Sequence, residues 1–340
     1  MAQPSQPKAQ VLSIDTPGLF AAAVQWAAEL LKAGQLVALP TETVYGLAAN
    51  ALDAEAVARI FQVKGRPAHN PLIVHIADIA MARQCVSDWP AAAERLAQAF
   101  WPGPLTLVLP RNPAIPDAVT AGGATVGVRW PSHLFIQAVI RACGFPLAAP
   151  SANLSNRVSP TSARHTQKQL GDRVPLIVDG GQCQVGIEST VVDLSVQPPC
   201  VLRPGMIHRE ALASVIGPVA LGRGPAAEVF KSPGLLRRHY APQTRLVIRS
   251  WNDERELRLI AAALGAPQGR TCVIAHTRVP GGEGFRRVSV IPHDPEAFAR
   301  AIYAELHACD EASAELIIVE ALPQSGEWQA IGDRLKRASV

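Results

Sequence analysis

Two cations separated by one glycine, Lys64-Gly65-Arg66, stand directly before Pro67 in this sequence. Glycine lets the backbone approach a ligand closely, and proline fixes the local direction of the chain. Lys64 is a compact point charge, whereas Arg66 can bind two oxygens at once, so the pair suits phosphate. The other interpretation is a helix end whose cations complement the helix dipole. We favour an anion site.

A second group of polar residues follows the double glycine Gly122-Gly123. Thr125 and Arg129 lie four residues apart on an expected strand, and residues an even number apart face the same side of a strand. An inward arginine needs an anion, which could be a substrate carboxylate or a structural aspartate.

The third group is Ser151 and Asn153, at the point where a strand of small residues runs into a loop. Hydroxyl and amide groups bind phosphate oxygens or a hydrated metal without adding charge, although such loops are also common turns. Ser189 and Thr190 offer hydroxyls at the start of a later strand. Loops at strand ends are where α/β sheets usually place ligands.

Composition and missing motifs limit the alternatives. The 340 residues suit two domains, with 48% hydrophobic and 18% charged residues. A net charge of +4 permits an anionic substrate or nucleic acid without requiring either. The sequence contains no P-loop, G-x-S-x-G or HExxH motif, and its six cysteines lack metal or disulfide spacing. The N-terminus lacks a signal-peptide pattern and no apolar run could span a membrane, so we expect a cytoplasmic protein.

Short apolar strands alternate with helical patterns, which indicates an α/β fold. The expected strands are Leu36–Leu39, Leu72–Ile76, Leu105–Leu109, Thr125–Arg129, Leu147–Ala149, Leu176–Asp179, Thr190–Asp193, Arg245–Arg249, Thr271–Ala275 and Leu316–Glu320. The expected helices are Gly18–Ala33, Ala54–Val63, Ala91–Phe100, Leu134–Cys143, Ser162–Leu170, Glu254–Leu264, Pro295–Asp310 and Trp328–Arg337. Between the two series lies a basic, Gly- and Pro-rich stretch, which we interpret as a short helix and an ordered linker.

In this order and spacing the motifs resemble the YrdC/Sua5 family of threonylcarbamoyl-AMP synthases, in its long two-domain Sua5 type. The resemblance rests on PTETVYGLAANA, KGRP with NPLIVHI, the pair Ser151-x-Asn153, GIESTVVD, LRPG, SPGLLRRHYAP and IGDRLKRAS, which extend over nearly the whole chain. It implies a YrdC-like twisted mixed open sheet with helices, plus a smaller Rossmann-like Sua5 domain. The implied boundaries are a polar tail at 1–10, the catalytic domain at 11–204, a linker and lid at 205–244, and the C-terminal domain at 245–340. The last has no G-x-G-x-x-G, so we expect no dinucleotide there.

The resemblance also implies an activity. Family members make L-threonylcarbamoyladenylate and pyrophosphate from L-threonine, bicarbonate and ATP, for the t6A modification of tRNA at adenosine 37. A carbamate of threonine attacks the α-phosphorus, so no protein nucleophile is needed and catalysis is mostly positioning and charge stabilisation. Mg²⁺ would bridge the ATP phosphates without direct protein ligands. Expected partners are the small substrates, a downstream TsaD-type threonylcarbamoyltransferase complex and, weakly, tRNA, but no membrane.

The site residues follow from the same resemblance. The catalytic set would be Lys64, Arg66, Ser151 and Asn153. ATP would be bound by Lys64, Arg66, Ala68, Thr125, Ser151, Ser159, Arg203 and Tyr240, the last as part of a lid that excludes water. Threonine would be bound by Thr41, His75, Arg129, Ala149 and Ser189.

Two other functions stay open. One is a non-catalytic RNA-binding module, which the modest charge, 5% aromatic residues and lack of an RNP motif disfavour. The other is a different carbamoyl transfer, as in hydrogenase-maturation proteins with a YrdC-like domain, whose zinc-finger-like and acylphosphatase segments are missing from this sequence.

Overall fold

The computed structural model describes residues 9–222, 231–233, 240–266, 268–281 and 283–339. The chain forms two compact units. The larger unit comprises residues 1–155 and 159–235, and the smaller comprises 156–158 and 236–340. The predicted polar tail lies almost wholly outside the described residues, as do residues 223–230 and 234–239 of the linker. The boundaries predicted from the sequence remain a proposal.

The larger unit contains, within the described residues, one mixed sheet of 11 strands in the order β1-β8-β2-β3-β7-β4-β6-β5-β9-β10-β11. Neighbours pair both ways: β4 is parallel to β6, for example, and β5 is antiparallel to β6. The strands are β1 (Gln10–Ser13), β2 (Val37–Leu39), β3 (Gly46–Asn50), β4 (Ile73–His75), β5 (Leu105–Pro110), β6 (Thr125–Arg129), β7 (Leu147–Ala148), β8 (Leu176–Asp179), β9 (Thr190–Asp193), β10 (Cys200–Arg203) and β11 (Ala220–Leu221).

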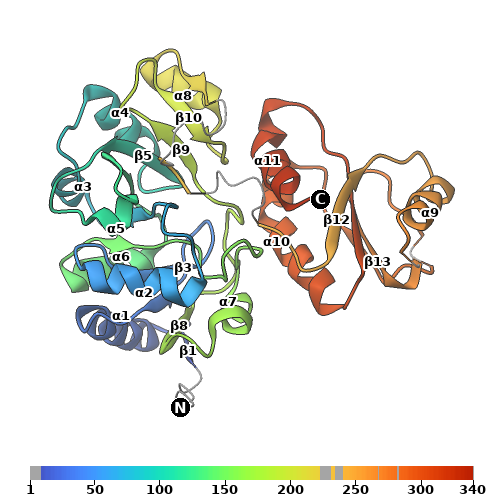
Figure 1. The fold of residues 1–340 in the computed structure, drawn as a ribbon, viewed down its shortest axis with the longest axis horizontal. Coiled ribbons are helices and arrows are strands. Elements are labelled where there is room, and N and C mark those ends of the chain that lie inside the picture. Colours follow the sequence, from blue (N-terminus) through green and yellow to red (C-terminus); the bar gives the residue numbers. More distant parts are fainter. Residues whose placement is uncertain (1–8, 223–230, 234–239, 267, 282, 340) are drawn as a thin grey trace. The chain divides into compact units, whose positions relative to one another are not determined.

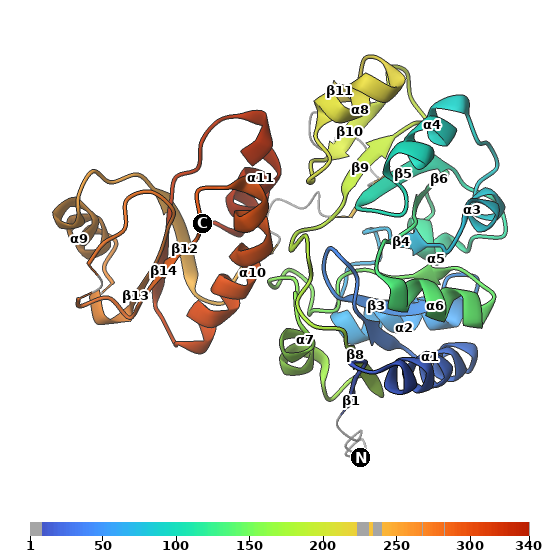
Figure 2. The same ribbon diagram turned by 180° about the vertical axis from the view of Figure 1, so that it is seen from behind.

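Helices cover both faces of this sheet (Figures 1 and 2). On one face α1 packs on α6, and Phe20 meets Phe135 edge-on with ring centroids 5.2 Å apart. The other face carries α2, α4 and α7 among others. The helices are α1 (Pro17–Lys32), α2 (Ala54–Lys64), α3 (Ile79–Cys85), α4 (Ala91–Phe100), α5 (Asp117–Thr120), α6 (Leu134–Cys143), α7 (Ala163–Leu170) and α8 (Arg209–Ile216).

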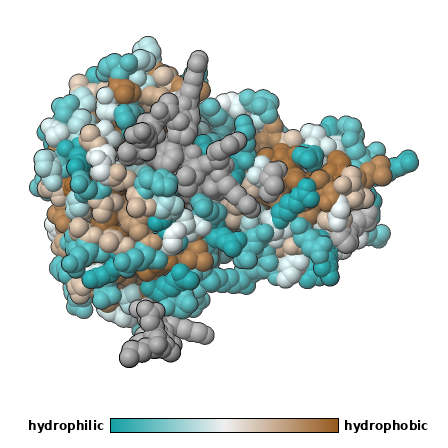
Figure 3. All heavy atoms as spheres, viewed as in Figure 1, coloured by the Kyte–Doolittle hydropathy of each residue, from teal (hydrophilic) through white to brown (hydrophobic). Residues whose placement is uncertain are grey.

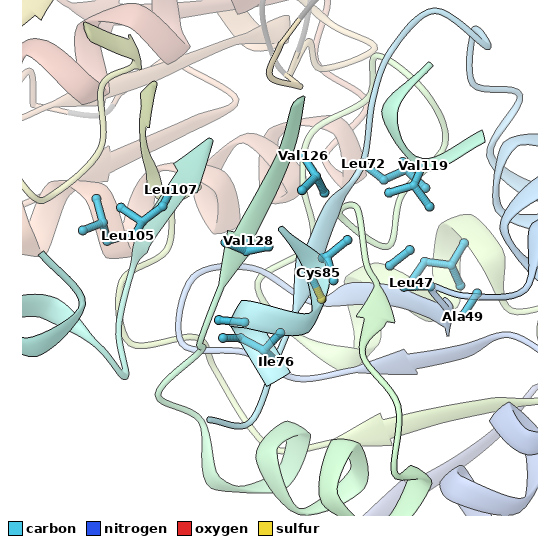
Figure 4. Packing of buried hydrophobic residues seen from close by; sticks show 14 of the residues in the cluster. Leu47, Ala49, Leu72, Ile76, Cys85, Leu105, Leu107, Val119, Val126 and Val128 are labelled. Carbon is cyan, nitrogen blue, oxygen red and sulfur yellow. The ribbon is translucent and has the colours of Figure 1, made fainter. Parts of the chain in front are cut away.

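Alternation along the strands divides the buried side chains between two cores. In β2, Val37 and Leu39 pack with α1 and α6, while Ala38 between them packs with the opposite cluster. Figure 4 shows part of that opposite cluster, in which Leu107 of β5 and Val128 of β6 lie among other apolar side chains. The alternation of side chains along a strand, with a period of two residues, therefore also determines which of the two cores each side chain enters.

The smaller unit is a parallel sheet of four strands, within the described residues, in the order β12-β15-β13-β14. Helix α9 lies on one face, and α10 and α11 lie on the other (Figure 1). The elements are β12 (Arg245–Arg249), α9 (Glu254–Ala263), β13 (Thr271–Ala275), β14 (Arg287–Val290), α10 (Pro295–Glu311), β15 (Leu316–Glu320) and α11 (Gln329–Ala338), with 3-10 turns at Gln268–Arg270 and Gly326–Trp328. The predicted fold class is confirmed: a large twisted mixed sheet with helices, followed by a small parallel α/β unit.

Some elements differ from those expected. We assigned no strand to Gly46–Asn50, yet it forms β3, paired with β2 and β7. The edge strand β14 and the short helices α3 and α5 were also missed. None of the helices among the described residues is long and apolar enough to cross a membrane. The face in Figure 3 mixes hydrophilic residues with smaller hydrophobic areas.

Candidate functional site

Lys64 is the last residue of α2, and the way this helix ends turns its side chain inward. Asp53 caps the first turn, accepting hydrogen bonds from the backbone N–H of Glu55 and Ala56. Gly65 adopts a left-handed conformation with φ 60°, which ends the helix. Lys64 Nζ then donates to the carbonyl oxygens of Ser151 and Asn153, each 2.5 Å away. The motif residues Lys64, Ser151 and Asn153 therefore meet at one point.

The charge of Lys64 has no carboxylate partner. Its side chain is 2% exposed, and no acidic side chain of the described residues lies within ion-pair distance of Nζ. Burial, together with the nearby Arg66 guanidinium, holds the lysine pKa well below its usual value. A buried cation surrounded by neutral oxygens is unfavourable without an anion. This point of the fold therefore suits an anionic ligand.

Arg66 lies beside Lys64 and is also buried. Its Nε donates to Asn70 O at 3.1 Å and its Nη2 to Pro71 O at 2.8 Å, which fixes the plane of the guanidinium in the turn before β4. Cations that only decorate a helix end are normally solvated, whereas these two are nearly inaccessible. The burial favours the anion-site interpretation.

The loop between β2 and β3 carries a second polar cluster. Thr41 Oγ1 donates to Val44 O at 2.6 Å and accepts from the Thr43 backbone N–H at 3.2 Å. Arg129, at the end of β6, donates from Nη1 to Thr43 Oγ1 at 2.9 Å. Thr41 Oγ1 also lies 2.9 Å from Thr43 Oγ1, so Thr41 and Arg129, both predicted for threonine, are joined through the Thr43 hydroxyl.

Arg129 also has an anionic partner that the sequence did not identify. Its Nη2 lies 2.7 Å from Glu42 Oε1 in an ion pair whose side chains are only 5% and 8% exposed. The expected anion was a substrate carboxylate or an aspartate, and in this structure it is a glutamate from the adjoining loop. Neither oxygen of Glu42 accepts a hydrogen bond from any described residue.

His75 lies next to Arg129, since the two are paired in register between β4 and β6. The imidazole is 3% exposed, and burial, followed by the charge of Arg129, lowers its pKa to about 3. The ring is therefore neutral at physiological pH. Its Nδ1 has no hydrogen-bond partner among the described residues, which leaves a polar atom available to a ligand.

Strand β3 links the two clusters. Gly46 forms an isolated bridge with Ser151. A Cβ on Gly46 would lie 3.4 Å from Ala149 Cβ and 4.0 Å from Thr41 Cγ2, so Ala149 and Thr41 approach each other across a position that lacks a side chain. The loop that carries Ser151 and Asn153 and the loop between β2 and β3 therefore run alongside each other.

A third group contains Ser189 and Arg203. Ser189 Oγ lies 2.8 Å from Thr106 Oγ1 and accepts from Arg203 Nη2 at 3.1 Å. Ser159 Oγ donates to Glu188 Oε1 at 2.6 Å, next to Ser189 in the chain. Ser159 and Arg203, both predicted for the nucleotide, therefore contact the segment Glu188–Ser189 just before β9, and Ser189 itself is predicted for threonine.

Three predicted residues are not joined to these clusters by a described contact. Ala68 is exposed in the turn after α2, and Thr125 is half-buried at the start of β6. Tyr240 belongs to the smaller unit, where it stacks on Tyr303 and lies under the Arg334 guanidinium, 5.2 Å from its ring centroid. Their roles remain predictions.

Polar residues that we did not assign also lie in these clusters: Glu42, Thr43, Thr106 and Glu188. The signal that could have found Glu42 and Glu188 is their place inside the motifs PTET and GIES, which also contain predicted site residues. In the structure both carboxylates are buried. The sequence alone did not indicate that either would be buried.

Comparisons with known proteins match both units. The family model Sua5_yciO_yrdC, described as telomere recombination, matches residues 29–205. A model described as the threonylcarbamoyl-AMP synthase C-terminal domain matches residues 207–340.

Among curated relatives, the threonylcarbamoyl-AMP synthase of Pyrococcus abyssi is 39% identical and that of Bacillus subtilis 42%. The first match covers 93% of this chain and 94% of the relative, and the second covers 92% of each. The crystal structure of P. abyssi Sua5 complexed with L-threonine superposes with a TM-score of 0.88 at 38% identity, covering 97% of this chain and 96% of that one.

Proposed function

Since the chain belongs to the Sua5 family of threonylcarbamoyl-AMP synthases and is an enzyme of that class, we propose that it makes L-threonylcarbamoyladenylate and pyrophosphate from L-threonine, bicarbonate and ATP. The product would serve the t6A modification of tRNA at adenosine 37. This is the activity that the motifs implied from the sequence.

The observation that carries the proposal is the burial of Lys64 without a carboxylate partner among the described residues. Its Nζ donates instead to the carbonyl oxygens of Ser151 and Asn153, the other two residues of the predicted phosphate site. A triphosphate would supply the missing negative charge, with Arg66 beside it as a planar donor. The cluster of Thr41 and Arg129 lies across β3 from this point. Two substrates, one a nucleotide and one an amino acid, would meet there.

The chemistry requires positioning more than covalent catalysis. Threonine and bicarbonate give a carbamate, whose oxygen attacks the α-phosphorus of ATP while pyrophosphate leaves. Lys64 and Arg66 would hold the phosphates and stabilise the charge that develops on them. Arg129 would hold the threonine carboxylate, with Thr41, His75, Ala149 and Ser189 around the amino acid. Ala68, Thr125, Ser159 and Arg203 would contact the nucleotide.

Mg²⁺ would arrive with ATP. Among the described residues no group of three His, Cys, Asp or Glu side chains could hold a metal ion, and the candidate phosphate site offers only uncharged oxygens. These residues fit an ion carried by the phosphates, where it would neutralise phosphate charge.

We also propose a lid, a location and a partner. Tyr240 would close over the nucleotide and exclude water from a labile mixed anhydride; part of the preceding linker, 223–230 and 234–239, lies outside the described residues. The boundaries 11–204, 205–244 and 245–340 are part of this proposal. The protein would act in the cytoplasm and pass its product to a TsaD-type transferase complex, with at most weak tRNA contact.

Pyrophosphate release tests the proposal. The purified full chain with MgATP should release pyrophosphate only when threonine and bicarbonate are both present. Salt-sensitive retention of RNA with no turnover would instead support the non-catalytic module. Turnover that does not depend on threonine would support a different carbamoyl transfer.

A further inference from the structure

Glu42 is a buried carboxylate whose hydrogen-bonding capacity is unused. The whole residue is 6% exposed, yet among the described residues neither of its carboxylate oxygens accepts a hydrogen bond, and its one ion pair is made with Arg129 through Oε1. Burying an ionised carboxylate with so few donors is costly. Such a group indicates a missing donor, and Oε2 is the atom that lacks a partner.

The Glu42–Arg129 pair presents one negative and one positive group side by side, with Thr43 Oγ1 bound to the arginine. A free α-amino acid is a zwitterion whose ammonium and carboxylate are attached to the same carbon. The two pairs are complementary: the substrate carboxylate matches Arg129, and the substrate ammonium matches Glu42. Threonine would therefore exchange one ion pair for two and leave no buried charge unpaired.

We propose that Glu42 binds the ammonium of threonine and accepts the proton that the amine must lose before it becomes a nucleophile. This inference rests on the proposed function. Ammonium and bicarbonate cannot form a carbamate directly, because the nitrogen lone pair is occupied by a proton. Glu42 takes that proton, the free amine attacks the bicarbonate carbon, and water leaves. The N–H bond breaks as the Glu42 O–H bond forms, and the net products are the carbamate, water and a neutral carboxyl group.

Protonation of Glu42 has a second consequence in the same cluster. The neutral carboxyl no longer balances the charge of Arg129, so the guanidinium becomes fully available to the substrate carboxylate. Three other groups face Glu42 or its pair: His133 before α6, Cys183 after β8, and His75 beside Arg129. Burial raises the pKa of the Cys183 thiol and lowers those of both imidazoles, so all three are neutral at physiological pH. Glu42 is the carboxylate of this cluster, and its Oε2, which lacks a partner among the described residues, is the atom placed to receive the proton.

Measuring how two ligands bind to two proteins isolates the role of Glu42 in holding the ammonium of threonine. Isothermal calorimetry would compare wild type and Glu42→Gln for L-threonine and for the dihydroxy acid that carries a hydroxyl in place of the α-amine. The substitution keeps the shape and removes the charge. We expect it to weaken threonine about 10- to 150-fold, the worth of one charge-assisted hydrogen bond, and to leave the dihydroxy acid unchanged or tighter. A purely structural role would weaken both ligands equally, and that result overturns the proposal.

A pH profile tests the proton transfer. In wild type, threonine-dependent pyrophosphate release should vary little with pH near neutrality. In Glu42→Gln, only threonine that is already deprotonated in solution can react, so the rate should rise about tenfold per pH unit below the pKa of the free amine. Parallel profiles would overturn the proposal. Wild-type protein that releases no pyrophosphate with threonine and bicarbonate would instead refute the proposed function.

Glu42→Gln removes the counter-charge of Arg129, which could prevent folding. Glu42→Asp is the second variant for that case. The aspartate keeps the charge for Arg129 but withdraws the carboxylate by one methylene. It should show the same selective loss of threonine binding, by a smaller factor. Equal affinity of this variant and wild type for threonine would contradict a direct contact.

Discussion

Replacing Lys64 by methionine should remove most of the stabilisation that MgATP gives to the folded protein. The substitution keeps a long flexible side chain and deletes the buried charge, which lies against the carbonyl oxygens of Ser151 and Asn153. If this charge exists to hold phosphate, its loss should affect the ATP complex far more than the overall fold.

The magnitude follows from ligand linkage. A charge-assisted hydrogen bond contributes about 1.5–3 kcal/mol, so its loss should weaken MgATP binding about 10- to 150-fold. At an ATP concentration 100 times the wild-type dissociation constant, wild type gains roughly 2.7 kcal/mol of stability. A variant that binds about 10- to 150-fold more weakly gains only about 0.3–1.4 kcal/mol under the same conditions.

Urea unfolding with and without MgATP measures this difference. Lys32→Met is the matched control, because Lys32 carries the same charge on an exposed position at the end of α1. The control should keep the full ATP effect, and far-ultraviolet circular dichroism should show that Lys64→Met is folded. An undiminished ATP effect in Lys64→Met would refute the assignment of Lys64 to phosphate.

Three further results are expected. Because the lysine pKa is lowered from its usual 10.5, the unfolded chain binds a proton that the folded chain lacks, so the contribution of Lys64 to stability, taken as wild type minus Lys64→Met, should rise with pH between the lowered value and 10.5. Urea unfolding of both proteins across this pH range measures the difference, and an equal pH dependence in the two would contradict a buried, destabilised charge. Gly205→Ala should lower the stability measured by thermal unfolding by about 1–3 kcal/mol or more, since a Cβ there would lie 2.3 Å from a backbone nitrogen of β9. Gly18→Ala should cost nothing, because a Cβ on Gly18 would meet no atom within 4 Å. Equal effects of the two substitutions would refute the packing argument. Arg129→Met should destabilise the protein by about 3–5 kcal/mol in urea, because Glu42 would be left as an unpaired buried charge, and a loss under 1 kcal/mol would show that the pair is not buried in solution.

Regular elements with a clear period could be predicted closely. The bounds of α4, α6, β6, β8, β9, β12 and β13 coincide with those expected from the sequence. These segments combine a helical period or a short apolar run with turn or loop residues at their ends, so local chemistry and tertiary packing agree. The prediction of strand Thr125–Arg129 also placed Arg129 correctly as a buried residue.

Long-range pairing explains the errors. Gly46–Asn50 consists of glycine, leucine, alanine and asparagine, which carry little strand propensity, and it becomes β3 only because β2 and β7 pair with it. The same limit applies to the site. Strand periodicity indicates which side Arg129 faces, but it cannot indicate that Glu42, far earlier in the chain, will meet it. The contact of Lys64 with the Ser151 loop likewise depends on the folded sheet.

Incubation with radiolabelled bicarbonate tests the central claim most directly. The full chain is mixed with MgATP, L-threonine and the labelled bicarbonate, and the nucleotide products are separated by chromatography. We predict label in a new adenylate that forms only when threonine is present, with pyrophosphate released in equal amount. Pyrophosphate release with no label in any adenylate, or a labelled adenylate that forms equally well without threonine, would contradict the account.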